Sequence, residues 1–159
     1  MAIYCIYILL VSVAATTAMT AFSYLAGTAR KEKFHEPELL NELIYGAKSL
    51  DFDPSKNNVL GWIFHFLIGL FFTAIFLLLY VVEIININIL SALIFGIAAG
   101  VVGSIGWRIM FSITENPPKV HLKEFYLQLI IAHIIFSIFI MLGFHWIEIY
   151  ILIDNIKSR

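Results

Sequence analysis

The sequence predicts an all-α protein that crosses a membrane as a four-helix transmembrane bundle. Of its 159 residues, 61% are hydrophobic and only 13% are charged, whereas about 25% of residues are charged in an ordinary soluble protein. Four apolar runs are long enough for a helix to cross a bilayer, which takes about 20 residues. Because these runs are continuous rather than alternating, they favour helices over the strands of a membrane barrel.

We place the four spans in the order in which the apolar runs occur along the chain. They are predicted at about 3–26, 59–82, 89–112 and 125–152. Short polar connections separate the last three runs, and a longer connection follows the first. The whole chain, 1–159, is therefore predicted to form a single integral membrane domain.

The long first connection contains a further predicted helix at about 37–47. Pro37 suits a first helical position, and Glu36 and Glu38 suit the positive end of the helix dipole. Gly46 suits the helix end. Apolar residues recur at helical spacing at Leu39, Leu40, Leu43, Ile44 and Ala47. This pattern predicts a short amphipathic helix lying on the membrane surface.

Lysine and arginine residues predict the orientation of the bundle. Connection 27–58 carries Arg30, Lys31, Lys33, Lys48 and Lys56, connection 113–124 carries Lys119 and Lys123, and connection 83–88 carries none. We therefore expect 27–58 and 113–124 to be cytoplasmic and both termini to lie outside, in a bacterial inner membrane. Lys157 and Arg159 near the C-terminus run against this orientation.

Two histidines lie in similar apolar contexts and suggest an internal repeat. His65 and His133 are each followed four positions later by a small residue, Gly69 or Ser137. Laying the first span on the third matches Ser12, Thr16, Thr20 and Tyr24 with Gly96, Gly100, Ser104 and Arg108. Both sets step by four along one helix face. The pattern is consistent with a 2+2 repeat about an axis along the membrane normal.

Small residues mark the faces on which helices are expected to pack. Gly96, Gly100 and Ser104 form a small-xxx-small stripe, which allows a neighbouring helix to approach closely. Gly69 and Ser137 lie on the faces that carry the two histidines. We predict all five as helix-packing positions.

The strongest candidates for ligand binding are polar residues at similar depth in the spans. His65 and His133 lie on the order of 10 Å from the cytoplasmic ends of their helices, at 1.5 Å per residue. Arg108, Trp107 and Tyr24 are predicted at the same level. Polar groups in hydrocarbon are costly unless the protein satisfies them. These five residues therefore predict a polar cavity, although the histidines can also serve only to hydrogen-bond helices, and Arg108 can extend to the headgroups.

Several chemistries fit such a cavity to different degrees. Histidine and arginine suit a proton relay, an anionic headgroup or a quinone. His65 and His133 on facing helices can also ligate haem b axially. Zinc or iron needs three or four ligands, and no carboxylate or thiol is expected at this depth. No catalytic motif or phosphate-binding glycine loop occurs, so the sequence does not predict an enzyme.

Part of the chain resembles a group of bacterial membrane proteins. The residues are Gly61-Trp62 through His65 to Tyr80, followed by Ser91-Ala92-Leu93-Ile94-Phe95-Gly96. They resemble small four-helix bacterial inner-membrane proteins with no assigned activity. The resemblance covers the second and third spans, and it implies a fold and a location only.

The sequence thus favours an inner-membrane protein whose His/Arg-lined cavity binds or transports a small ligand, a lipid or a proton. The alternative is an accessory subunit that packs against other membrane proteins or copies of itself. A haem-binding electron carrier is a third reading. The lipid bilayer is a predicted partner, whereas the net charge of −1 predicts no nucleic-acid binding.

Overall fold

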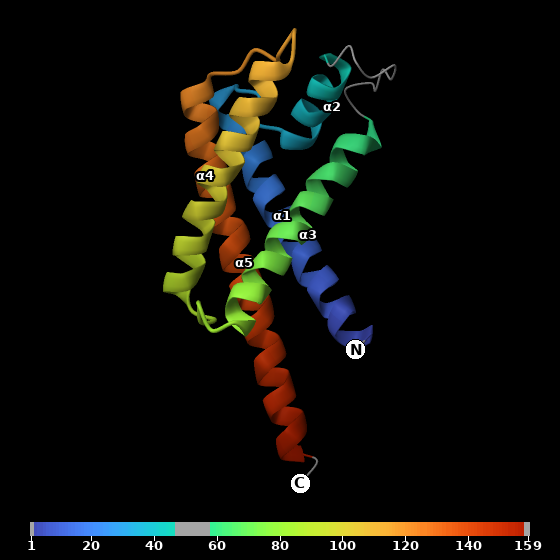
Figure 1. Ribbon diagram of the computed structural model, residues 1–159, viewed down its shortest axis with the longest axis vertical. Helices are drawn as coiled ribbons and strands as arrows, with labels where there is room; N and C mark the ends of the chain where they lie inside the picture. Colours follow the sequence, from blue (N-terminus) through green and yellow to red (C-terminus); the bar gives the residue numbers. More distant parts are fainter. Residues whose placement is uncertain (1, 47–57, 158–159) are drawn as a thin grey trace.

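The computed structural model describes residues 2–46 and 58–157, with side chains described over 5–46 and 58–147. These residues form helices and no strand (Figure 1): α1 (Ala2–Arg30), α2 (Glu36–Gly46), α3 (Val59–Val81), α4 (Ile89–Ile113) and α5 (Leu122–Lys157). The predicted all-α class is confirmed.

Four of the helices are long and apolar enough to cross a membrane. The spans are Cys5–Arg30, Val59–Val81, Ile89–Ile113 and Leu122–Ile147. This confirms four long apolar helices where the spans are predicted, and it is compatible with a multi-pass membrane protein. The helices α1 and α5 extend beyond the predicted limits, because the backbone stays helical past the end of an apolar run until a turn or cap stops it.

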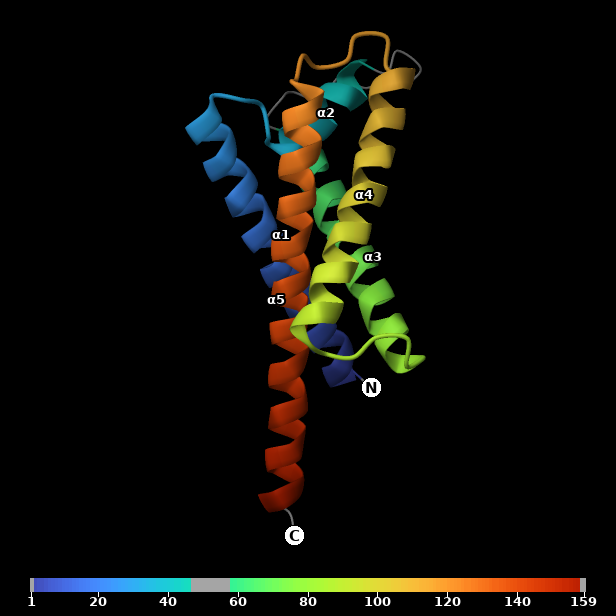
Figure 2. The ribbon, with the colours of Figure 1, turned by 90° about the vertical axis from the view of Figure 1, so that its left-hand side faces the viewer.

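The helices form an open bundle rather than four parallel rods. The helix α1 packs on α3 and α5, and α4 packs along α5, whereas α3 and α4 make few contacts although they are consecutive. Figure 1 shows α3 crossing α1 and running away from α4 toward the end where α2 lies. Both views place α2 and the connection from α4 to α5 at one end, with the chain termini at the other (Figure 2).

The helix α2 forms where the sequence predicts a helix in the first connection. Its first turn carries Glu36 and Glu38 at the positive end of the helix dipole. Its apolar residues Leu39, Leu40 and Leu43 are buried in a cluster with α4 and α5. This cluster also contains Phe34, Trp107, Phe111, Phe125 and Leu129. The helix therefore closes one end of the bundle.

One buried asparagine fixes α2 to the start of α3. The Asn41 Nδ2 donates to Asn58 O (2.7 Å), and the Gly61 amide donates to Asn41 Oδ1 (2.8 Å). A side chain at Gly61 would not fit, because a Cβ there would lie 2.1 Å from Pro37 O. This contact sets the position of the first turn of α2, which carries Glu36.

The opposite half of the bundle is a dense apolar core. Phe76 is fully buried, with its ring centroid 5.1 Å from that of Phe95 and 6.2 Å from that of Phe144. Ala15, Ala99, Ala132, Phe136 and Ile140 complete the buried cluster together with Met19. The small alanines let the helices approach while the aromatic rings fill the space between them.

Three sequence predictions about the fold stay predictions. They are the 2+2 repeat, the amphipathic surface role of the 37–47 helix, and the side of the membrane on which the termini lie. Ala47, the last residue of that predicted helix, lies outside the described residues.

Candidate functional site

A cavity of about 280 Å³ lies where α3 diverges from α4. We call it the α3–α4 cavity. It is lined by Met19 of α1, Glu36 and Leu40 of α2, His65, Ile68, Gly69, Phe71 and Phe72 of α3, Val102, Gly103, Gly106, Trp107 and Met110 of α4, and Leu129, His133 and Phe136 of α5. Most of this lining is apolar, and three of its residues are titratable.

The α3–α4 cavity opens sideways between α3 and α4. Its lining residues Ile68, Phe71 and Val102 are 44%, 62% and 57% exposed. These exposed apolar side chains lie within the two candidate membrane spans. In a bilayer, the opening would therefore face lipid tails rather than water.

His65 is held in the cavity wall by a hydroxyl of α1. Its Nε2 lies 2.8 Å from Thr20 Oγ1, and the same hydroxyl lies 2.7 Å from Thr16 O. A carbonyl only accepts hydrogen bonds, so the single hydroxyl proton of Thr20 goes to Thr16. We therefore assign the proton of the neutral ring to Nε2, where it is donated to Thr20. The His65 Nδ1 is then left as an acceptor.

His133 presents the opposite nitrogen as an acceptor. Its Nδ1 lies 2.8 Å from Leu129 O, so Nδ1 carries the proton and Nε2 keeps its lone pair in the neutral ring. The Nε2 edge faces α4 at a glycine, because a Cβ at Gly103 would lie 3.3 Å from it. In the neutral form, each histidine thus keeps one ring nitrogen as an acceptor, and both residues line the cavity.

Glu36 supplies a buried carboxyl that the sequence does not predict at this depth. Its Oε1 accepts from Ser23 Oγ (2.7 Å), and Gln128 Nε2 lies 3.4 Å from Oε1 and 2.6 Å from Ser23 Oγ. The Glu36 Oε2 and the Gln128 Oε1 are buried without a hydrogen-bond partner. Burial raises the pKa of Glu36 to about 7, against the opposing effect of the Ser23 hydrogen bond.

The expectation that no carboxylate lies near the histidines is therefore wrong. It assumed that the 37–47 helix stays outside the bundle, whereas the Asn41 contacts hold its first turn against α3. A signal for this placement exists in the polar residues Ser23 and Gln128, which lie inside apolar runs and are both buried. Each needs a polar partner in the interior, and Glu36 is that partner.

The structure brings together three of the five predicted ligand-binding residues. His65, His133 and Trp107 all line the α3–α4 cavity, whereas Arg108 and Tyr24 do not. Arg108 is exposed and lines a different pocket at the end of α4.

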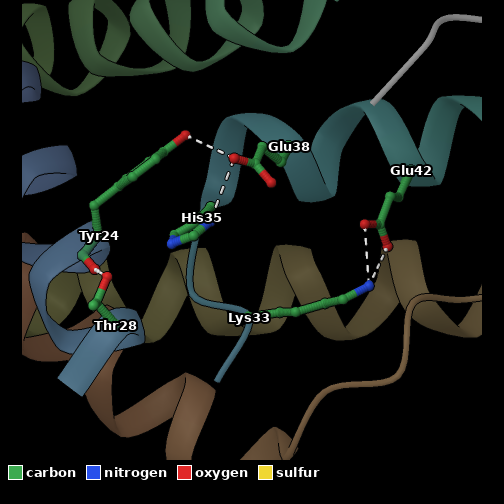
Figure 3. Close-up of polar contacts among 6 residues, drawn as sticks. All are labelled: Tyr24, Thr28, Lys33, His35, Glu38 and Glu42. Carbon is green, nitrogen blue, oxygen red and sulfur yellow. Dashed lines mark hydrogen bonds and ion pairs between the residues drawn. The ribbon is translucent and has the colours of Figure 1, made fainter. Parts of the chain in front are cut away.

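Tyr24 belongs to a polar group at the base of α2 (Figure 3). Its ring stacks on His35 at a centroid distance of 4.0 Å, and its hydroxyl donates to Glu38 Oε1 (3.3 Å). His35 Nδ1 approaches the same carboxylate at 3.4 Å. These contacts help to orient α2 on α1, so Tyr24 has a positioning role at this end of the bundle.

Three of the five predicted packing residues, the glycines, lie at close helix contacts. A Cβ at Gly69 would lie 2.0 Å from Thr16 Oγ1, and Cβ atoms at Gly96 and Gly100 would lie 2.6 and 2.7 Å from the Cα atoms of Ile134 and Ile130. Ser137 is fully buried on α5, and Ser104 Oγ donates to Gly100 O (2.8 Å). The two histidine helices thus share the neighbour α1, and α5 also packs along α4.

The polar groups of the cavity can form hydrogen bonds with a bound molecule. Among the described residues, no group of three or more His, Cys, Asp or Glu side chains is arranged to hold a metal ion. A volume of 280 Å³ lies below the usual range for drug-sized ligands. A haem is larger than such ligands, so it would require α3 and α4 to move further apart.

Comparisons with protein-family models, with curated proteins and with solved structures found no match for this chain. The resemblance to four-helix bacterial inner-membrane proteins therefore stays a prediction.

Proposed function

We propose that this chain is a multi-pass membrane protein that binds a small amphiphile in the α3–α4 cavity. The ligand would carry a hydroxyl or amino group on an apolar body. One observation supports this proposal above all others. A cavity with mainly apolar walls is also lined by the buried residues Glu36, His65 and His133.

The ligand is assigned a donor group because both cavity histidines, in the neutral form, keep one ring nitrogen as an acceptor. His65 Nδ1 and His133 Nε2 each keep a lone pair, and Glu36 Oε2 has no partner. A buried acceptor without a partner costs roughly 1–3 kcal/mol. A ligand hydroxyl or amine that donates to one of them offsets this cost, whereas a purely apolar ligand does not.

The apolar body follows from the walls and the opening. Phe72, Val102 and Met110 can contact only apolar groups, and the exposed rim between α3 and α4 provides a path from the lipid phase. A molecule already dissolved in the membrane would not have to cross water to reach the cavity. We therefore propose lateral entry from the bilayer.

We further propose that the bilayer is a bacterial inner membrane with the α2 end of the bundle in the cytoplasm. The connections that carry most of the lysine and arginine residues emerge at this end (Figure 1). Such residues are retained on the cytoplasmic side of bacterial membrane proteins. Glu36 would then lie at the cytoplasmic end of the cavity.

Quenching of Trp107 fluorescence tests the binding proposal. A Trp62→Phe, Trp146→Phe protein keeps Trp107 as the single tryptophan, and Trp107 lines the cavity. The probe is a medium-chain alcohol with a terminal bromine, added to protein in bilayers. We expect saturable quenching, with weaker binding of the matching methyl ether, which has no donor.

Two leucine variants on α4 separate the cavity from the bilayer around it. Gly106→Leu fills the cavity, since a Cβ at Gly106 meets nothing within 4 Å. Ala98→Leu adds the same bulk at an exposed position outside the cavity. We expect the first to abolish saturable quenching and the second to leave it unchanged. Quenching that rises linearly with alcohol content in all three proteins would overturn the proposal.

A further inference from the structure

A second pocket, at the α2 end of the bundle, has a different chemical character. It measures about 660 Å³ and lies between the last turns of α4, the connection to α5 and the first turns of α5. We call it the basic pocket. It is lined by Glu32, Arg108, Phe111, Ser112, Pro117, Pro118, Lys119, Val120, His121, Leu122 and Tyr126.

Three of the lining residues are basic, and they come from two parts of the chain. Arg108 lies on α4, and Lys119 and His121 lie on the connection to α5. Among the described residues, no carboxylate forms an ion pair with Arg108 or Lys119. Their charges are therefore available to an anion from outside the chain.

The one carboxylate in the pocket is already engaged. Glu32 Oε1 contacts His121 Nδ1, and this contact raises the pKa of His121. The ion pair holds the connection near α1 and leaves the positive charges of Arg108 and Lys119 in excess. Tyr126, which also lines the pocket, has a buried hydroxyl without a hydrogen-bond partner.

The position of Arg108 indicates the level of the pocket in a bilayer. It lies five residues before Ile113, the last residue of α4, so it is near the end of a candidate span. An arginine near a helix end reaches the headgroup region, where the phosphates of lipids lie. The apolar residues Phe111, Val120 and Leu122 line the same pocket and can contact the adjoining parts of a lipid.

We propose that the basic pocket binds a phosphate group, supplied by the headgroup of an anionic phospholipid. Arg108 provides planar paired donors for phosphate oxygens, and Lys119 provides a second positive charge. This inference requires the helices to cross a bilayer, but it is independent of ligand binding in the α3–α4 cavity.

Lipid retention measured by native mass spectrometry tests the inference. The protein is reconstituted in nanodiscs that contain phosphatidylglycerol and phosphatidylcholine in equal amounts, then released into the gas phase. We expect wild-type protein to retain phosphatidylglycerol preferentially. Arg108→Gln with Lys119→Gln should weaken this preference roughly tenfold or more, because each basic residue near the surface adds to the attraction for anionic lipid.

A matched variant distinguishes a pocket from general surface charge. Lys31→Gln removes one exposed positive charge at the same end of the bundle without touching the pocket, and it should preserve the preference. Arg108→Lys keeps the charge but not the paired donors, so this variant should retain part of the preference for phosphatidylglycerol. No preference in wild-type protein, or an equal loss in Lys31→Gln, would overturn the inference.

Free phosphate is the other source of the same chemistry. Thermal unfolding in lipid-free detergent with added inorganic phosphate separates the two sources. Stabilisation by phosphate that the double variant lacks would show that the pocket accepts the free ion, whereas phospholipid retention alone would assign it to the membrane. The temperature of unfolding without phosphate also shows whether the double variant is folded.

Discussion

The two halves of this bundle use the same four long helices in opposite ways. At the end near the termini, Phe76, Phe95 and Phe144 fill the space between helices with stacked and edge-on rings. At the α2 end, α3 leaves α4, and the gap holds a cavity lined by Glu36, His65 and His133. The first half is built for packing density, and the second leaves unfilled volume and unpaired acceptors.

Glycine has different roles at different positions along one helix, α4. Gly96 and Gly100 allow the backbone of α5 to approach α4, with no room for a Cβ. Gly106, further along the same helix, lines the cavity instead, and a Cβ added there would meet no atom within 4 Å. Small residues of α4 therefore allow close contact with α5 at Gly96 and Gly100 and leave open space at Gly106.

The largest expected effect on stability comes from removing one ring of the aromatic core. Phe76→Ala should lower the free energy of unfolding by about 3–5 kcal/mol, because it removes a fully buried ring and leaves a cavity. Phe72→Ala, on the wall of the α3–α4 cavity, should cost less than half as much. Reversible unfolding in mixed micelles measures both. Equal losses would mean that the two halves are packed alike.

The next largest expected effect is a pH dependence of stability, which arises from Glu36 in the half that contains the α3–α4 cavity. The folded state raises the pKa of Glu36 to about 7 from 4.5, so folded protein holds this proton more tightly than unfolded protein. Stability should therefore fall as pH rises from about 4.5 to about 7, by about 3 kcal/mol from this group, and level off above. Glu36→Gln should remove this part of the pH dependence. Identical pH profiles for the two proteins would contradict the burial of Glu36.

A pair of alanine substitutions compares the glycines directly. Gly96→Ala should destabilise the protein by about 1–3 kcal/mol, since its Cβ would lie 2.6 Å from Ile134 Cα. Gly106→Ala should be neutral or stabilise by up to about 1 kcal/mol, because alanine is the better helix former and the space is open. The free energies of unfolding of the two variants, measured by the same assay, test this difference. Destabilisation by Gly106→Ala as large as that by Gly96→Ala would exclude an open cavity there.

The smallest effect tests the hydrogen bond that holds His65. Thr20→Val removes the hydroxyl that lies 2.8 Å from His65 Nε2 and should cost about 1 kcal/mol. Thr17→Val is the matched control, because the exposed Thr17 hydroxyl donates only to Val13 O within its own helix. Its effect should stay within about 0.5 kcal/mol. A control that costs as much as Thr20→Val would show that His65 gains nothing from α1.

The sequence predicts the helices well because their length and apolarity are local properties. It also places Gly69, Gly96 and Gly100 where helices meet, since small residues at four-residue spacing leave a groove. It does not predict at which glycines a neighbouring helix occupies the space that a Cβ atom would take. Gly96 and Gly106 are the same residue on the same helix, and only the direction taken by α3 and α5 separates them.

The misplaced ligand-binding residues have a geometric explanation. Four residues of an α-helix turn through about 400°, so positions that step by four drift by about 40° each time. From Ser12 to Tyr24, or from Gly96 to Arg108, the drift reaches about 120°. Tyr24 and Arg108 therefore face directions other than that of the cavity. The sequence does not predict the position of Glu36 for a different reason, because its contacts with Ser23 (2.7 Å) and Gln128 (3.4 Å) join α2 to α1 and α5, and only the tertiary fold brings these helices together.

Cysteine accessibility tests most directly the claim that the α2 half contains an open cavity for an amphiphile. In a Cys5→Ala background, which removes the only native cysteine, Gly106→Cys places a thiol where a Cβ has open space. A small membrane-permeant thiol reagent should label this protein in bilayers, and a medium-chain alcohol should slow the labelling in a saturable way. Failure to label the folded protein, or labelling that the alcohol does not slow, would contradict the account.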